Sequence, residues 1–185
     1  MKFNMGCGLN RIEGYVNVDK FAECRPDLLM DLEILPWNIG SDEADEVLFN
    51  HSLEHIGGDP DLFLAIMKEL YRVCKAGATV QINVPHPRHD NFLSDPTHVR
   101  AITPMTLALF SKANNRAWEV AGGANSPLAF YCDVDFETVR TDHVLERKYL
   151  DRLRSGELTN EQLVDMVNER NNVVAEYRLT LKVVK

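Results

Sequence analysis

The sequence lacks features that would carry the chain into a membrane or onto nucleic acid. No apolar run approaches the roughly 20 residues that a membrane-spanning helix needs. Basic residues are few: 20 Lys and Arg stand against 28 Asp and Glu, so the formal net charge is -8. Such an excess of negative charge argues against a general phosphate-binding face. We therefore expect no membrane partner and no nucleic-acid partner.

Cysteines are also few and scattered. The four do not form a Cys-x-x-Cys pair, so they fit neither a disulfide framework nor a zinc site; they are Cys7, Cys24, Cys74 and Cys132. No signal peptide is visible, because strand-forming residues begin almost at once. We expect reduced thiols, a cytoplasmic protein and one domain over residues 1–185.

The most informative stretch runs from Lys2 to Asp19. It predicts a short strand, a Gly6-Cys7-Gly8 turn, a short connection and a second strand, Val16–Asp19. Glycine has no Cβ, so backbone N–H groups can approach a ligand at such a turn. Asp19 would lie at the carboxyl end of its strand, the edge where open α/β sheets bind ligands. A tight turn with a surface aspartate is the alternative.

The next segments predict more strands and one strong helix. Strands are expected over 27–32, 46–51 and 78–84. Between the last two, Asp59 is a suitable N-cap and Pro60 a suitable first residue for a helix with apolar residues at three- and four-residue spacing. Lys75 would lie in the last turn and Gly77 just beyond it.

The second half predicts irregular segments, helices and a closing strand pair. A long loop over 85–102 leads to a helix over 103–112 and a flexible flap over 114–127, so 85–127 is expected to be an insertion beside the ligand site. Strands are predicted over 136–147 and 173–184, as an antiparallel edge pair. Residues 151–171 would be inserted between them, with a helix opened by the capping box at Thr159.

These signals, in this order, resemble the class I S-adenosylmethionine-dependent methyltransferases. Asn4–Gly8 is similar to the first motif of that family, Val16–Asp19 to the second and Asp31-Leu32 to the third. Glu46–Ile56 is like the fourth strand and its Leu-Glu-His turn, and Ala65–Val84 like the helix and strand that follow. The resemblance implies a Rossmann-like α/β fold, with a mostly parallel doubly wound sheet and an antiparallel edge pair.

The resemblance also implies the cofactor S-adenosylmethionine and residues that bind it. The Gly6-Cys7-Gly8 turn would surround the methionine part, Asp19 would bind the ribose and Asp31 the adenine. The full set of implied cofactor-binding residues is Asn4, Gly6, Cys7, Gly8, Asp19, Lys20, Asp31, Leu32 and Asn50. The sequence departs from the family at Asn4, where an acid is usual, and at Asn10, where a third glycine is expected. It also starts without the helix that often covers the acceptor side, so we expect an open acceptor side.

Two histidines after the fourth strand are the candidate catalytic residues. Methyl transfer from a sulfonium requires mainly positioning, with a base only for some acceptors, and in principle no metal. His51 could position the acceptor or accept a proton, because histidine titrates near neutrality. His55 could do the same, or could simply hold the turn beneath the cofactor. We interpret Glu54 as a helix-start or solvent carboxylate.

The loop over 85–100 concentrates polar groups, namely His86, His89, Asp90, Asp95, His98 and Arg100. One interpretation is a lid that binds the acceptor through Asp95, His98 and Arg100. The second is a metal site of mixed imidazole and carboxylate ligands, and the third a solvated loop. We favour the lid and expect no metal ligands.

Three hypotheses for function follow. The first is methyl transfer from S-adenosylmethionine to a small-molecule or carbohydrate-like acceptor. The second keeps the cofactor but denies the catalysis, so that the chain is a binding module completed by a second copy or a partner subunit. The third is a metal-dependent hydrolase built on the His/Asp loop. The sequence does not identify the acceptor.

Overall fold

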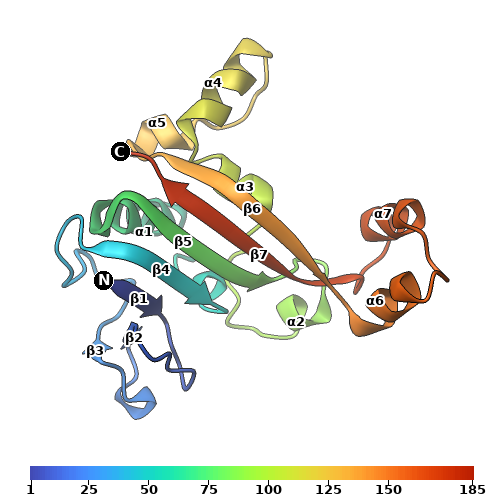
Figure 1. Cartoon of the computed structure of the whole chain (residues 1–185). Helices are drawn as coiled ribbons and strands as arrows, with labels where there is room; N and C mark the ends of the chain where they lie inside the picture. Colours follow the sequence, from blue (N-terminus) through green and yellow to red (C-terminus); the bar gives the residue numbers. More distant parts are fainter.

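The computed structural model describes residues 1–185 and contains one seven-stranded sheet, with strand order β3-β2-β1-β4-β5-β7-β6 (Figure 1). The parallel strands are β1 (Lys2–Met5), β2 (Val16–Asp19), β3 (Leu28–Leu29), β4 (Ala44–Asn50) and β5 (Cys74–Pro85). Strand β7 (Val174–Val183) pairs antiparallel with β5 and with the edge strand β6 (Phe136–Leu145). The predicted Rossmann-like, mostly parallel sheet with an antiparallel edge pair is confirmed.

The crossover from β1 to β2 contains no helix. The two strands pair in parallel, with Asn4 opposite Asn17, although only residues 6–15 connect them. The buried Asn17 side chain forms hydrogen bonds with the backbone of this connection, as the backbone of a helix would do for itself. Its Oδ1 accepts from the Ile12 N–H at 2.8 Å, and its Nδ2 donates to the carbonyls of Ile12 and Tyr15, both at 3.2 Å. A side-chain amide thus satisfies the backbone groups of a connection too short to satisfy them itself.

Helix α1 (Pro60–Val73) begins where the sequence predicted. The Asp59 carboxylate accepts from the backbone N–H groups of Asp61 and Leu62, and Pro60 is the first residue. The helix ends earlier than predicted, because Cys74 is already extended and pairs with Ala44 in the sheet. Lys75 and Gly77 therefore lie within β5 and not at a helix C-terminus.

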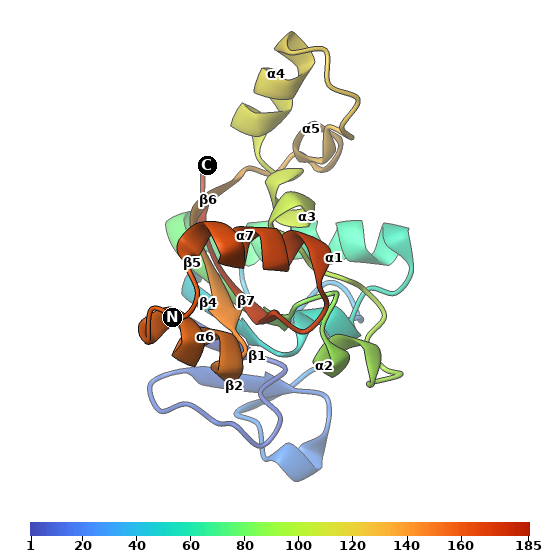
Figure 2. The same ribbon diagram turned by 90° about the vertical axis from the view of Figure 1, so that its right-hand side faces the viewer.

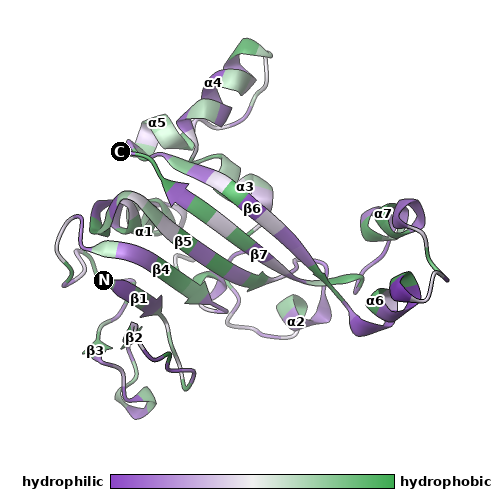
Figure 3. Cartoon of the chain, in the orientation of Figure 1, coloured by the Kyte–Doolittle hydropathy of each residue, from purple (hydrophilic) through white to green (hydrophobic).

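The core lies between the sheet and helices on one of its faces. Helices α1 and α3 (Pro104–Ala108) pack against that face, as Figures 1 and 2 show. Along β5, Val80, Ile82 and Val84 are completely buried, while the alternate residues are polar and only partly buried. The same alternation is visible as hydropathy bands along β5 and β7 in Figure 3. On the other face of β5 lie the polar side chains of Thr79, Gln81 and Asn83.

The segment between β5 and β6 is more helical than predicted. It contains α2 (Asp90–Leu93), α3, α4 (Lys112–Val120) and α5 (Leu128–Cys132). The helix predicted over 103–112 stops at Ala108, and Ser111 caps a new one, its Oγ accepting from the Asn114 N–H. The predicted flap over 114–127 is thus wrong in its first half: residues 114–120 belong to α4, which is tied to α5 because buried Asn115 accepts from the Ala129 N–H.

Helices α6 (Arg147–Arg154) and α7 (Asn160–Glu169) stand between β6 and β7. The predicted capping box opens α7, with Thr159 and Gln162 bonded reciprocally. The insertion starts at Arg147, four residues before the prediction. It has a small core of its own, built on Tyr149, Leu158 and Val173. None of the helices in the chain has both the length and the apolar character needed to cross a bilayer.

The cap of α1 gives a direct test of the fold. Replacing Asp59 by alanine removes an acceptor from two N–H groups, so Asp59→Ala should lower the free energy of unfolding by about 1 kcal/mol. Asp59→Asn, which keeps the side-chain oxygen, should stay close to the wild type. Urea denaturation of both variants checks this. Equal losses in the two would show that charge, and not the cap bond, matters here.

Candidate functional site

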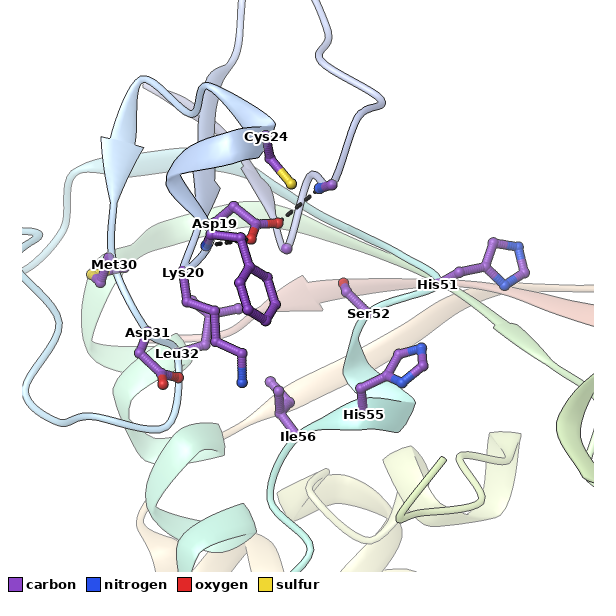
Figure 4. A pocket seen from close by; sticks show the side chains of 13 residues that line it. Asp19, Lys20, Cys24, Met30, Asp31, Leu32, His51, Ser52, His55 and Ile56 are labelled. Atoms are coloured by element: carbon purple, nitrogen blue, oxygen red, sulfur yellow. Dashed lines mark hydrogen bonds between the residues drawn. The ribbon is translucent and has the colours of Figure 1, made fainter. Parts of the chain in front are cut away.

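The strand order reverses at β1, whose neighbours are β2 on one side and β4 on the other. In open α/β sheets, ligands bind outside the carboxyl ends of the strands at this point. A cavity of about 270 Å³ lies there, lined by thirteen residues from the turn after β1, the end of β2, the segment after β3 and the turn after β4 (Figure 4). Its size is near the lower end of the range for ligand pockets, roughly 300–1,000 Å³.

The floor of the cavity is the glycine turn. Gly6 has φ +68°, and a Cβ on it would lie 2.6 Å from the Cβ of Ser52. Ser52 follows β4, and its Oγ donates to the Met5 carbonyl at 2.7 Å. The two adjacent strand ends are therefore so close that only glycine fits between them.

Asp19 connects the glycine turn to the end of β2. Its Oδ2 accepts from the Gly8 N–H at 2.8 Å, and its Oδ1 accepts from the Phe21 N–H at 2.9 Å. The residue is only 7% exposed, yet its carboxylate lines the cavity. Each oxygen keeps a lone pair that could accept from a ligand hydroxyl.

The far end of the cavity is apolar with one acid at its rim. Phe21, Met30, Leu32 and Ile56 line it. Asp31 stands beside them and accepts from the Glu33 N–H through Oδ1 alone, which leaves Oδ2 available. This combination suits a flat, largely apolar ring that also carries an N–H donor.

A second cavity of about 690 Å³ adjoins the first, and His51 and His55 line both. Its walls are the short 3₁₀ turn η2 (Leu53–His55) after β4 and the loop from Pro85 to His98. Apart from Pro85 and Pro96, its lining residues carry polar side chains. A polar second molecule could therefore meet a ligand of the first cavity at these two histidines.

His51 is held between two carboxylates. Its Nε2 lies 2.8 Å from Glu176 Oε2, and its Nδ1 lies 3.6 Å from Glu54 Oε1. Glu54 first, and then Glu176, raise the pKa of His51, against burial, which lowers it. Its backbone has φ +54°, uncommon for a residue with a side chain. A strained residue at a cavity edge is typical of functional sites.

Glu54 lies in the first turn of η2, which fits the helix-start interpretation, but it is not a solvent carboxylate. It is 1% exposed, and neither of its oxygens has a hydrogen-bond partner. The turn η2 directs its side chain inward, while its carbonyl accepts from the N–H groups of Val99 and Arg100. His98 Nε2 lies 4.0 Å from Glu54 Oε1, and the rings of His55 and His98 are 4.6 Å apart.

The structure brings most of the predicted cofactor residues to the first cavity. Those that line it are Gly6, Gly8, Asp19, Lys20, Asp31 and Leu32, together with His51 and His55. Three predicted residues do not line it. Asn4 is buried and donates to the Asn10 carbonyl and to Asn17, Cys7 is buried against the turn, and Asn50 accepts from Asn83.

Of the predicted acceptor residues, Asp95 and His98 line the second cavity. Arg100 does not, because its guanidinium donates to the Gly57 carbonyl at 2.7 Å and lies over the Phe63 ring. The other loop histidines lie apart: His86 packs on Tyr177, and His89 pairs with Glu146 at 3.0 Å. The loop alone therefore does not assemble the metal cluster that we considered.

Sequence reasoning missed five residues of the first cavity, namely Phe21, Cys24, Met30, Ser52 and Ile56. Two of these carried a usable signal. Phe21 lies two residues after the strand-end acid, and Ser52 directly follows the strand expected over 46–51. The short 3₁₀ turn η1 (Ala22–Cys24), which brings Cys24 to the cavity, had no clear pattern in the sequence.

Comparison with solved structures places the fold. A SAM-dependent methyltransferase from Archaeoglobus fulgidus matches 98% of this chain and 85% of its own, with 20% identity and a TM-score of 0.61. The 1,6-didemethyltoxoflavin-N1-methyltransferase from Burkholderia thailandensis, solved with its substrate and S-adenosylhomocysteine, matches 100% and 71%, with 14% identity and a TM-score of 0.54. The [4+2]-cyclase SpnF matches 99% and 75%, with 15% identity and a TM-score of 0.52.

No family model matches the chain, and no curated protein matches it by sequence. At identities of 20% and below, the structural likeness shows the fold alone. The chain has the fold of class I S-adenosylmethionine-dependent methyltransferases, and the same fold is used by a cyclase.

The glycine turn can be tested with a matched pair of variants. Both glycines have positive φ, but a Cβ on Gly8 would meet no atom within 4 Å. Gly8→Ala should therefore cost only conformational strain, about 1–2 kcal/mol. Gly6→Ala adds the overlap with Ser52 and should cost about 2–4 kcal/mol. Thermal and urea denaturation compare them. Equal losses would contradict the close approach of the two strand ends.

His86 should make stability depend on pH. Burial, then the charge of Arg88, lowers the pKa of His86 to about 4, and its Nδ1 accepts from the Arg88 N–H. Below about pH 6.5, His86 binds a proton in the unfolded chain but stays neutral in the native protein. The free energy of unfolding should thus fall by about 1–3 kcal/mol between pH 6.5 and 4.

Replacing His86 by asparagine should remove that part of the pH dependence, since the amide oxygen can still accept from Arg88. The wild type, measured over the same pH series, supplies the reference slope. Denaturation at a series of pH values gives the result. An unaltered slope in His86→Asn would rule out this residue as the cause.

Proposed function

We propose that the protein transfers the methyl group of S-adenosylmethionine to a small, polar acceptor such as a carbohydrate-like molecule. One observation carries the proposal: at the point where the strand order reverses, a glycine turn and two acids, Asp19 and Asp31, line a cavity that opens into a second, polar one. The fold shared with methyltransferases supports the same conclusion.

The lining of the first cavity fits an adenosyl ligand. Gly6 and Gly8 line the cavity without side chains, so the backbone of the turn can approach the methionine part there. Asp19 offers lone pairs to ribose hydroxyls, and Asp31 offers its free oxygen to the adenine amino group. Phe21, Leu32 and Ile56 would exclude water from the ring. When bound, the cofactor supplies an electrophilic methyl group and its own leaving group.

The second cavity would hold the acceptor. Seven of its nine lining residues carry polar side chains, and His51 and His55 stand at its junction with the first cavity. His51, oriented by Glu176 at 2.8 Å, is placed to accept the acceptor's proton or to position its oxygen. Asp95 and His98 would orient the rest of the acceptor.

A second candidate function is binding of S-adenosylmethionine without methyl transfer. In this alternative the chain binds the cofactor and is completed by a partner or by a second copy. The observation that favours it is Asn4: the side chain at the family's usual acid position turns away from the cavity to Asn17. A contact to the methionine amino group would then be missing, and turnover would require help. Cofactor binding without turnover on any acceptor would distinguish this alternative.

The test is calorimetry with S-adenosylhomocysteine. The wild type should bind one equivalent. Asp31→Asn replaces a free oxygen acceptor by a donor, and Asp19→Asn removes a charged acceptor. Each should weaken binding by about 5- to 100-fold, equivalent to about 1–3 kcal/mol.

Asp27→Asn is the matched control, because Asp27 also accepts from backbone but does not line the cavity. Its affinity should match the wild type. Circular dichroism confirms that each variant is folded. If folded wild-type protein binds no S-adenosylhomocysteine at millimolar concentration, both functions are excluded.

A further inference from the structure

The turn after β4 and the loop after β5 bring three potential metal ligands together. One ligand atom from each of Glu54, His55 and His98 lies within 4.8 Å of the others. Glu54 and His55 are in η2, whereas His98 is more than forty positions away in sequence. The fold assembles this group, and the Glu54 carbonyl, by accepting from the N–H groups of Val99 and Arg100, holds the loop in place.

The carboxylate at the centre of the group makes no hydrogen bond and faces imidazoles only at ion-pair distance, His51 Nδ1 at 3.6 Å and His98 Nε2 at 4.0 Å. Glu54 is 1% exposed, and both its oxygens lack a hydrogen bond. A buried carboxylate without compensation costs several kcal/mol, so such groups are normally paired or bind a cation. Arg100, the nearest basic residue along the loop, is occupied with the Gly57 carbonyl and the Phe63 ring. The surrounding side chains that can respond to the carboxylate are imidazoles.

The hydrogen bonds of the two imidazoles fix which nitrogen is free. His98 Nδ1 lies 2.8 Å from the Phe92 carbonyl, which can only accept, so Nδ1 carries the proton. Thr97 donates its hydroxyl proton to Asp95 at 2.6 Å, so it accepts from His55 Nδ1 at 2.9 Å. In both rings Nε2 is left with its lone pair. Metal-ligating histidines are held by such bonds from the other nitrogen.

We propose that Glu54, His55 and His98 bind a divalent transition-metal ion. Two imidazoles and a carboxylate suit zinc, iron and their neighbours better than magnesium or calcium. Ligand atoms around one zinc ion at about 2.0–2.2 Å lie about 3.4 Å apart. The 4.0 Å between His98 Nε2 and Glu54 Oε1 therefore has to shorten by about 0.6 Å, and the widest separation in the group, up to 4.8 Å, by up to about 1.4 Å, through side-chain rotation. This revises the expectation from sequence of no metal ligands.

The ion would face the acceptor cavity. Glu54, His55 and His98 all line the second cavity, and three protein ligands leave a coordination position for another molecule. An oxygen of the acceptor, from a hydroxyl or a carboxylate, is the group that such a position takes. This role for the ion rests on the proposed function, whereas its binding does not.

The competing account is a proton. A proton on His51, whose Nδ1 lies 3.6 Å from Glu54 Oε1, or a second proton on His98, whose Nε2 lies 4.0 Å from Glu54 and 3.9 Å from Asp95, would give the carboxylate a charged N–H donor. The pair would then need no metal. The two accounts predict different results when metal is added. If a proton compensates Glu54, the protein binds no metal. If the Nε2 lone pairs of His55 and His98 are free, the protein binds one equivalent.

The experiment is a titration of the reduced full chain, freed of metal with a chelator, with Zn²⁺ followed by calorimetry. We expect one equivalent to bind with micromolar or tighter affinity. Glu54→Gln and His98→Gln should each weaken it at least about tenfold, because each removes one of three ligands. His143→Gln, a histidine outside both cavities, should leave the affinity unchanged.

Co²⁺ provides a second readout that does not depend on the variants. Wild-type protein should give a visible ligand-field spectrum without thiolate charge-transfer bands, which excludes binding at Cys7 or Cys24. Absence of stoichiometric binding, thiolate bands, or an affinity unaltered in both Glu54→Gln and His98→Gln would overturn the proposal. Binding of S-adenosylhomocysteine is measured on the same samples. A chain that binds this ligand but no metal would refute the metal site and leave the proposed function standing.

Discussion

The buried amide pair of Asn4 and Asn17 is the interaction on which the ligand side of the sheet depends. Their side chains are 3.0 Å apart on neighbouring strands, and Asn17 also satisfies backbone groups of residues 12 and 15. Without a helix between β1 and β2, the connection itself adds only the bonds from the Asn10 N–H to the Cys7 carbonyl and from the Tyr15 N–H to the Ile12 carbonyl. A buried amide left unpaired would cost about 1–3 kcal/mol, so the pair stabilises the crossover strongly. It also explains why an amide, and not an acid, occupies position 4: a carboxylate could not donate to the Asn10 carbonyl.

This architecture gives Asp19 two tasks. The same carboxylate that would bind a ribose already accepts from Gly8 and Phe21, so the shape of the cavity depends on it. Such preorganisation has an advantage, because the oxygens are fixed before a ligand arrives. It also means that the turn and the ligand contact cannot change independently. Asp31 is less committed, with one oxygen free, and is the more adaptable of the two acids.

The parts that could be predicted from the sequence are those governed by local rules. The Asp59-Pro60 helix start, the Thr159 capping box and the strand-turn-strand opening depend on a few neighbouring residues, and the structure confirms them. The parts that could not be predicted depend on distant contacts. Helix α4 is fixed by Asn115 reaching α5, and the burial of Glu54 follows from the loop that folds over it. From the sequence alone, a glutamate in a Leu-Glu-His turn is predicted to be exposed, because the position of the distant loop is not known.

The turn η2 is where the two cavities and the buried charge meet. His55 lines both cavities, and Glu54 lies between His51 and His98. Any positive charge that compensates Glu54, whether a proton or a metal ion, therefore lies beside the junction where the two ligands would meet. In a low-dielectric site its field acts at close range on whatever occupies that junction. Burying the Glu54 carboxylate therefore costs free energy of folding. In return, its negative charge favours a cation at the one wall that both ligands would share.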